Sequence, residues 1–290
     1  MNISQGLAIK LPKCNIILIL LIIYQKDFKY VNLLFQRWKI YWRNELNMTY
    51  CLAIKVDEGM VFASDSRTNA GLDDYNSYSK MFTYSVGDRC VVLLTSGNLS
   101  TSQNVFHRLE TDLKNPKDEL NLNTCNDLEE MASYIGKLSV EYSEKNIENI
   151  NQGNLNFSSF FILGGQIKGQ SQKAFLIYPE GNYILSSEDS PYFQIGETKY
   201  GKPILDRVIQ KETSLGDAAR AALVSIDSTM RSDLSVGPPI DFVVYKNNNI
   251  NLDLKDKLRL DTPYFMNLSD IWHKKIISSF KDLPSFHWEE

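Results

Sequence analysis

The sequence has little histidine and little cysteine, with three and four residues of these types among 290. The cysteines are Cys14, Cys51, Cys90 and Cys125, and none of them has the CxxC or Cys/His spacing of a zinc site. Cysteines scattered in this way also argue against a disulfide framework, so we expect a reduced, cytoplasmic chain. With so few histidines, a His-based triad or a metal centre of several histidines has little support.

An excess of positive charge is also missing, because 31 Lys and Arg residues face 35 Asp and Glu residues. We find no basic stripe interleaved with aromatic residues, and we therefore expect no nucleic-acid partner. The sequence contains no GxGxxG, P-loop, HExxH or GxSxG motif, which removes common signatures of nucleotide binding, zinc peptidases and serine hydrolases. The hydrophobic fraction of 43% is ordinary for a globular protein.

The apolar run at residues 16–24, IILILLIIY, is too short to cross a bilayer. Lys10 and Lys13 precede it, as in a signal peptide, but no small-residue cleavage site follows. Residues 1–47 are therefore either a leader, anchor or propeptide, or upstream sequence attached by an early start, with translation beginning at Met48. We favour the second interpretation because of the chemistry of Thr49, and expect no membrane contact unless the leader is real.

After Met48, alternating polar and apolar residues predict β-strands that tight turns join in pairs. The expected strands are 49–56, 60–66, 81–86, 89–95, 157–166, 174–178, 183–185 and 240–245. Expected helices begin after Asn98, near Asp127 and at Ser214, where Ser214 and Asp217 resemble a capping box. The tail alternates again at residues 252–260 and ends in an amphipathic stretch near 270–280.

The order of these elements is strands, two helices, strands, one helix and strands. Such separate blocks favour an α+β fold with helices packed outside antiparallel sheets over alternating βαβ units. Because repeats and low-complexity linkers are missing after Met48, we expect a single domain over residues 48–290.

Thr49 offers a particular chemistry if translation begins at Met48 and that methionine is removed. A terminal threonine combines a hydroxyl nucleophile with an α-amino group that can act as its base. A free α-amino group titrates near ~7.7–8.0, so it exchanges protons readily at neutral pH. An internal threonine lacks this base, because its nitrogen is a peptide amide. A real leader would therefore have to be cut between Met48 and Thr49, where no glycine precedes the threonine.

Seven strings, taken in their order and spacing, carry a resemblance to a known family. They are 48–51 (MTYC), 62–71 (FASDSRTNAG), 80–81 (KM), 95–99 (TSGNL), 164–166 (GGQ), 196–202 (GETKYGK) and 230–237 (MRSDLSVG). The chain resembles proteasome β-type subunits, in particular the bacterial ancestral β-type branch called Anbu. The resemblance covers residues 48 to about 245.

The resemblance implies a catalytic role for four residues. Thr49 is similar to the family's nucleophile, and Asp65 to the aspartate that orients the catalytic lysine and holds the terminus. Lys80 is similar to that lysine, whose charge favours the deprotonated hydroxyl. Gly97 is similar to the glycine whose N–H forms the oxyanion hole. Each has a simpler interpretation: Asp65 as a turn residue, Lys80 as solvated surface, and Gly97 as a break between strand and helix.

Three further residues are assigned by the same resemblance. Asp233 and Ser235 are similar to the polar pair that hydrogen-bonds the terminal amine, although their spacing is tighter than in many family members. Thr198 stands where the family usually has a serine, and this is the loosest match. A simpler interpretation of Asp233 is the end of a helix.

The family implies a four-layer αββα sandwich of the N-terminal nucleophile hydrolase type and a threonine-type peptidase that needs no metal or organic cofactor. It also implies a homo-oligomer that acts on peptides or unfolded proteins, with a possible ATP-dependent unfoldase as partner. Two alternatives remain open: a structural subunit with little activity, or an amidohydrolase that acts on small amides. From about residue 247 the chain extends past the usual core, and we expect an assembly element with an apolar helix face at Ile271, Trp272, Ile276, Ile277 and Phe280.

Overall fold

The computed structural model describes residues 49–69, 75–114, 120–148, 156–252 and 254–289. The expected leader at 1–47 and the expected start at Met48 lie outside these described residues. Residues 1–46 and 47–290 form separate units, so the following description concerns the second unit alone.

Two five-stranded antiparallel sheets form the centre of this unit. The first has the order β10-β1-β2-β11-β12, with β1 (Tyr50–Val56), β2 (Gly59–Asp65), β10 (Tyr192–Gly196), β11 (Ile240–Lys246) and β12 (Leu254–Leu258). The second has the order β5-β6-β7-β8-β9, with β5 (Met81–Val86), β6 (Arg89–Gly97), β7 (Ser159–Ile167), β8 (Lys173–Ile177) and β9 (Tyr183–Leu185). A short hairpin adds β3 (Arg67–Asn69) and β4 (Tyr75–Ser77).

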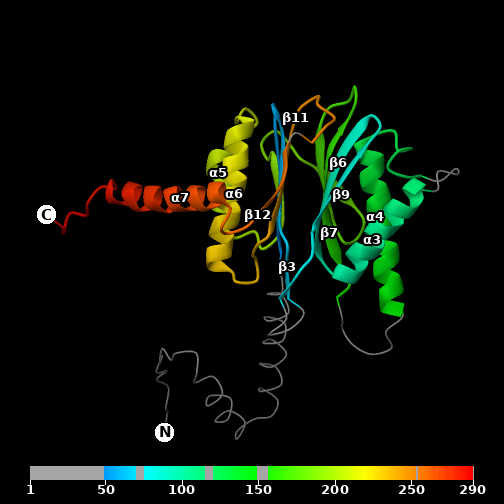
Figure 1. Ribbon diagram of the computed structural model, residues 1–290, viewed down its shortest axis with the longest axis horizontal. Helices are drawn as coiled ribbons and strands as arrows, with labels where there is room; N and C mark the ends of the chain where they lie inside the picture. Colours follow the sequence, from blue (N-terminus) through cyan, green and yellow to red (C-terminus); the bar gives the residue numbers. More distant parts are fainter. Residues whose placement is uncertain (1–48, 70–74, 115–119, 149–155, 253, 290) are drawn as a thin grey trace, which may run out of the picture. The chain divides into compact units, whose positions relative to one another are not determined.

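Helices cover the outer face of each sheet, as Figure 1 shows. α5 (Lys202–Val208) and α6 (Leu215–Ser232) lie on the side of the first sheet, and α3 (Leu99–Lys114) and α4 (Leu128–Glu148) on the side of the second. The last helix, α7 (Pro263–Lys281), follows β12 and contacts α6. The expected four-layer αββα sandwich is therefore confirmed.

Three clusters of buried side chains hold the four layers together. One joins α6 to the first sheet through residues such as Ile226 and Leu52. The second joins α3 and α4 to the second sheet through residues such as Phe106. The third, which includes Phe62 and Leu94, fills the space between the sheets.

The expected helix starts are confirmed by their side-chain caps. The Asn98 side chain accepts a hydrogen bond from the N–H of Thr101 (3.2 Å), and Asp127 accepts one from the N–H of Glu130 (2.8 Å). Ser214 accepts one from the N–H of Asp217 (3.1 Å). Each cap satisfies a donor that the first turn of a helix leaves without an intrahelical partner, which is why these short-range patterns predict the starts well.

Candidate active site

Thr49 lies directly before β1, and its backbone is held by the neighbouring strand. Its carbonyl accepts a hydrogen bond from the N–H of Glu197 at 2.7 Å, which continues the pairing of β1 with β10. Gly196 makes this close approach possible, because a Cβ atom at that position would lie 1.9 Å from the Thr49 oxygen. Its φ of 88° is also one that a side chain disfavours. The two strands therefore fix the position of the Thr49 carbonyl.

Asp65 ends β2 and receives three hydrogen bonds. The N–H of Tyr50, the residue after Thr49, donates to Oδ1 at 2.9 Å, and Lys80 Nζ donates to the same oxygen at 2.7 Å. The N–H of Gly237 donates to Oδ2 at 3.2 Å. One carboxylate thus links the start of β1, the residue before β5 and the segment after α6. Asp65 is therefore a buried junction between three segments and not a simple turn residue.

The Asp65–Lys80 ion pair is buried, with side-chain exposures of 0% and 8%. Lys80 Nζ also donates to the carbonyl oxygen of Arg67 at 2.7 Å. Burial raises the pKa of the Asp65 carboxyl above its usual value, and the Lys80 ammonium and the two backbone N–H groups oppose that rise. Lys80 is therefore not the solvated surface lysine of the simpler interpretation.

Gly97 ends β6 at the same end of the sandwich as Thr49. Two hydrogen bonds to Thr95 show this. The Cys51 thiol on β1 donates to the Thr95 carbonyl at 3.3 Å, and the Thr95 N–H donates to the Lys80 carbonyl at 3.0 Å. Thr95 lies two residues before Gly97, so β6 contacts both β1 and Lys80 close to this glycine. Gly97 has a φ of 119°, and a Cβ atom there would lie 2.4 Å from the Ser158 oxygen. A glycine is needed at this position because of the close contact with Ser158, directly before β7, which agrees with the strand-to-helix interpretation. Gly97 is also exposed.

Asp233 and Ser235 are brought together immediately after α6. Asp233 is the C-cap of this helix, as the simpler interpretation expects, and its Oδ1 accepts hydrogen bonds from the N–H of Ser235 at 2.8 Å and from its hydroxyl at 2.6 Å. Gly237, two residues further on, reaches Asp65 through its N–H. Thr198 is partly buried and follows Glu197, the residue that binds the Thr49 carbonyl.

Three further residues, which the family resemblance did not single out, hold this arrangement. Glu197 is buried and binds Thr49 through its backbone. Arg67 supplies the carbonyl that accepts from Lys80, and its guanidinium donates to the Leu234 carbonyl at 2.5 Å. Gly237 leaves room for that guanidinium, because a Cβ atom there would lie 2.4 Å from Arg67 Cζ. All three residues lie in the strings that carry the family resemblance, which was the available signal.

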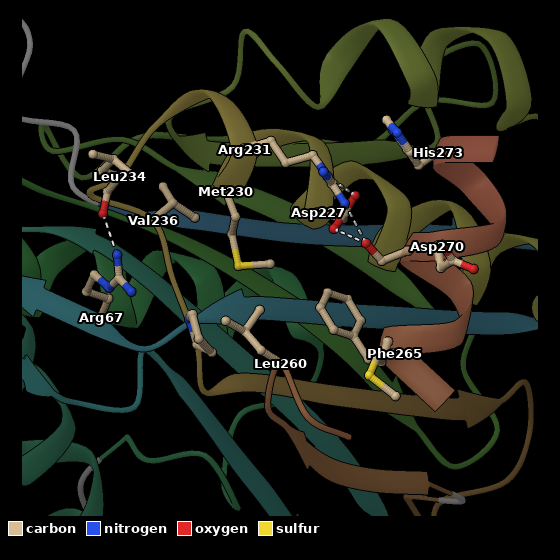
Figure 2. Close-up of a pocket in the computed structure, with 13 residues that line it drawn as sticks. Arg67, Asp227, Met230, Arg231, Leu234, Val236, Leu260, Phe265, Asp270 and His273 are labelled. Atoms are coloured by element: carbon tan, nitrogen blue, oxygen red, sulfur yellow. Dashed lines mark hydrogen bonds and ion pairs between the residues drawn. The ribbon is translucent and has the colours of Figure 1, made fainter. Parts of the chain in front are cut away.

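Arg67 also lines a cavity of about 470 Å³ between α6, the segment 234–238 and the first turns of α7. Figure 2 shows Leu234 and Val236 on the side of Arg67, and Asp227, Arg231 and His273 toward α7. The cavity therefore adjoins the segment that carries Asp233 and Ser235, on the helical side of the first sheet.

Comparisons with known proteins found similar chains of the same fold. The family model described as Proteasome subunit matches residues 47–245. Anbu (ancestral beta-subunit) from Yersinia bercovieri is 39% identical, with 82% of this chain and 99% of that chain covered and a TM-score of 0.77. Anbu from Hyphomicrobium sp. strain MC1 is 40% identical, with coverages of 82% and 99% and a TM-score of 0.75.

A third structure, titled as the helical assembly of the Anbu complex from Pseudomonas aeruginosa, is 39% identical, with coverages of 82% and 98% and a TM-score of 0.78. A search of curated proteins found no match. Within the described part of the chain, no helix has the length and apolar character needed to cross a membrane.

Proposed function

Because the chain belongs to the proteasome subunit family, and within it to the ancestral β-subunit (Anbu) group, we propose that it is a threonine-type peptidase with Thr49 as nucleophile. The observation that carries the proposal is the buried Asp65–Lys80 ion pair, which is tied to the backbone N–H directly after Thr49. A buried pair of this kind is costly to desolvate and is weak support for a purely stabilising role. Its position beside Thr49 supports a catalytic one.

The proposed activity requires a free amine at Thr49. Either translation begins at Met48 and that methionine is removed, or a leader is cleaved between Met48 and Thr49. The family match begins at residue 47, two residues before Thr49, which supports this position for the working terminus. We favour initiation at Met48.

In the proposed reaction, the Thr49 hydroxyl attacks a peptide carbonyl and its proton passes to the Thr49 α-amino group. The positive charge of Lys80 favours the deprotonated oxygen, while Asp65 holds Lys80 in place. The Gly97 N–H stabilises the oxyanion, and the new α-ammonium gives its proton to the leaving amine. The resulting ester is hydrolysed by a water molecule whose proton the same amine accepts, which regenerates Thr49.

Asp233, Ser235 and Thr198 are proposed to hold the α-amino group near the Thr49 hydroxyl. The close pairing of Asp233 with Ser235, and the link from the same segment to Asp65, support this role. We further propose that the chain works in the cytoplasm as a homo-oligomer that acts on peptides or unfolded proteins. The helical assembly of the relative from Pseudomonas aeruginosa supports the homo-oligomer alone. An ATP-dependent unfoldase is a proposed partner.

A structural subunit without peptidase activity is the second candidate. The observation in its favour is that 48 residues precede Thr49 in the sequence, because an uncleaved chain would leave its nitrogen as an amide.

Intact mass and N-terminal sequencing of the protein from its native host would test the proposal. We expect a terminus at Thr49, and a terminus at Met1 or Asn2 would overturn the proposed activity. Peptidase assays should then compare the wild type with Thr49→Ala, which removes the nucleophile, and Thr49→Ser, which keeps a hydroxyl. Equal activity in the wild type and in Thr49→Ala would point to another nucleophile, and a processed chain that assembles but cleaves no peptide would favour the structural subunit.

A further inference from the structure

Tyr50, the residue directly after Thr49, is completely buried and ends in a hydroxyl group. Its ring belongs to the cluster between the first sheet and α6, whereas the next side chain, Cys51, belongs to the cluster between the two sheets. Successive side chains of a strand point to opposite faces, so Tyr50 points away from the space between the sheets and toward α6. Its exposed fraction of 0% keeps the side chain out of contact with a substrate.

The Tyr50 hydroxyl lies in a small buried network. It shares a hydrogen bond with the hydroxyl of Ser225, which lies on α6 and is also 0% exposed, and it accepts one from Gln194 Nε2 on β10 at 2.5 Å. Gly201, directly before α5, packs against this network, because a Cβ atom there would lie 2.3 Å from both the Tyr50 and the Ser225 hydroxyl oxygens. Three segments besides β1 therefore meet at one phenol.

The hydroxyl of Tyr50 is not needed to fill this space. A phenylalanine would supply nearly the same apolar area, and a buried hydroxyl is unfavourable unless it is hydrogen-bonded. Burial raises the pKa of the Tyr50 phenol above its usual value, so the group stays neutral and keeps its proton for the network. Hydrogen bonds are directional, so a bonded network of this kind fixes the position of the ring more closely than apolar packing does.

The backbone beside Tyr50 is held at the same place. The Tyr50 N–H donates to Asp65 Oδ1 at 2.9 Å, and the Thr49 carbonyl accepts from the N–H of Glu197 at 2.7 Å. Both polar groups of the peptide bond between Thr49 and Tyr50 are thus hydrogen-bonded. A terminal Thr49 has a covalent neighbour on one side alone, and chain termini are poorly ordered unless they are tied down. Its hydroxyl and amine are therefore positioned through this peptide bond and through Tyr50.

The same network connects Tyr50 to the polar segment after α6. Thr229 Oγ1 donates to the Ser225 carbonyl at 2.9 Å, and the N–H of Asp233 donates to the Thr229 carbonyl at 2.8 Å. Asp233 lies eight residues after Ser225 (233 − 225), which is about 12 Å along the helix axis. Because the helix between them is continuous, a shift of Tyr50 relative to Ser225 also changes the distance between the start of β1 and Asp233.

We propose that Tyr50 is a positioning residue, which sets the amine and hydroxyl of Thr49 by anchoring the start of β1 to α6. The inference rests on the proposed peptidase function and deepens it, since it identifies a side chain that holds the working terminus. A displacement of about 1 Å in the reacting groups can lower a rate by about 10². Loss of the anchor should therefore lower kcat and leave KM unchanged, because the buried side chain does not touch the substrate.

Tyr50→Phe, which keeps the ring and removes the hydroxyl, is the first test. We expect kcat for a short peptide to fall about tenfold or more, with KM within about twofold of the wild-type value. Tyr134→Phe is the matched control, because it also removes a buried hydroxyl, which is hydrogen-bonded to Asp112 on the helices of the second sheet. Urea midpoints should fall in both variants, and kcat in Tyr50→Phe alone. Wild-type kcat in Tyr50→Phe would overturn the proposal.

Ser225→Ala removes the partner on α6 and tests the same contact from its other side. It also keeps the test available if Tyr50→Phe does not fold. We expect a similar fall in kcat, and the double variant should fall no further than either single variant, because all of them lose one shared interaction. Losses that multiply in the double variant would overturn the proposed link between Tyr50 and Ser225.

Hydrogen–deuterium exchange separates this inference from the proposed function. The backbone amides of residues 49–56, measured by mass spectrometry, should exchange faster in Tyr50→Phe and Ser225→Ala than in the wild type and Tyr134→Phe. If a wild-type protein that begins at Thr49 cleaves no peptide, the proposed function fails, while faster exchange in these two variants still supports the anchor. Unchanged exchange in both variants would overturn the anchor, whatever the activity of the wild type.

Discussion

The Asp65–Lys80 pair and the second half of α7 are opposite cases in one chain. The pair is buried, and every donor that reaches Asp65 comes from a different segment of the same molecule. The second half of α7 is exposed and presents apolar side chains to solvent. The first region is packed within one copy of the chain, whereas the second leaves large apolar side chains such as Phe280 exposed.

This difference predicts which substitutions should change the stability or the activity of a single copy of the chain. A substitution at the buried pair leaves a charge without compensation in the interior, so it should affect folding and chemistry in a single copy. A substitution in the second half of α7, where the side chains are exposed, should leave the stability of a single copy almost unchanged. Pairs of variants, one in each region, would test this difference.

The largest effect is expected for Lys80→Ala. It leaves the Asp65 carboxylate buried without its cation, and we expect a loss of ~3–5 kcal/mol in the free energy of unfolding. If the peptidase proposal holds, activity should also fall by about 10²–10⁴. Lys274→Ala on α7, which breaks an exposed pair with Asp270, should change stability by less than ~0.5 kcal/mol. Urea unfolding would measure the free energy of unfolding of both variants. Equal losses in the two would contradict the expected difference between the buried and the exposed ion pair.

Phe265→Ala and Phe280→Ala compare the two halves of α7. Phe265 is 1% exposed and Phe280 is 73% exposed. We expect the first substitution to destabilise the protein by about 3–5 kcal/mol through a cavity, and the second to change the stability of a single copy by less than about 0.5 kcal/mol. Unfolding must be measured at a concentration where the protein is dissociated. A similar loss in both would mean that the second half of α7 packs within its own chain.

The sequence predicted the parts of the fold that depend on local signals. Strand alternation and the caps at Asn98, Asp127 and Ser214 concern neighbouring residues, and the structure confirms them. β10, of five residues, and α5, of seven, were not predicted. Each is too short to show a period, and β10 exists because β1 pairs with it.

The site was predictable only through the family resemblance. Spacing alone does not show that Asp65 and Lys80 meet, because they come from different strand pairs. The Arg67 carbonyl and the Gly237 N–H are backbone groups, which have no signature in a sequence until the fold places them. The apolar residues at the end of α7 were visible in the sequence, but their exposure among the described residues was not.

A smaller effect is expected where Thr49 meets β10. Gly196→Ala would place a Cβ atom 1.9 Å from the Thr49 oxygen, whereas Gly169→Ala, also at positive φ, meets nothing within 4 Å. Both substitutions introduce backbone strain, so the difference between the free energies of unfolding of the two variants reports the cost of the collision. We expect this difference to be about 1–3 kcal/mol. Thermal or urea unfolding would measure it. Equal stabilities of the two variants would show that β1 and β10 can separate at this end without loss.

The smallest effect is expected at the exposed start of α6, which is docked along its length, in contrast to α7. The Ser214 hydroxyl and Arg220 lower the pKa of the Asp217 carboxyl below its usual value. A carboxyl whose pKa is lower in the folded protein than in the unfolded chain stabilises the fold at a pH above its unfolded pKa of about 3.9. That contribution is lost as the pH falls through the folded-state pKa. The stability difference between the wild type and Asp217→Asn should therefore be small and favourable to the wild type at pH 7, and should shrink below about pH 4. Urea midpoints measured from neutral to acid pH would test this, and a difference independent of pH would mean that the charge of Asp217 does not support the helix start.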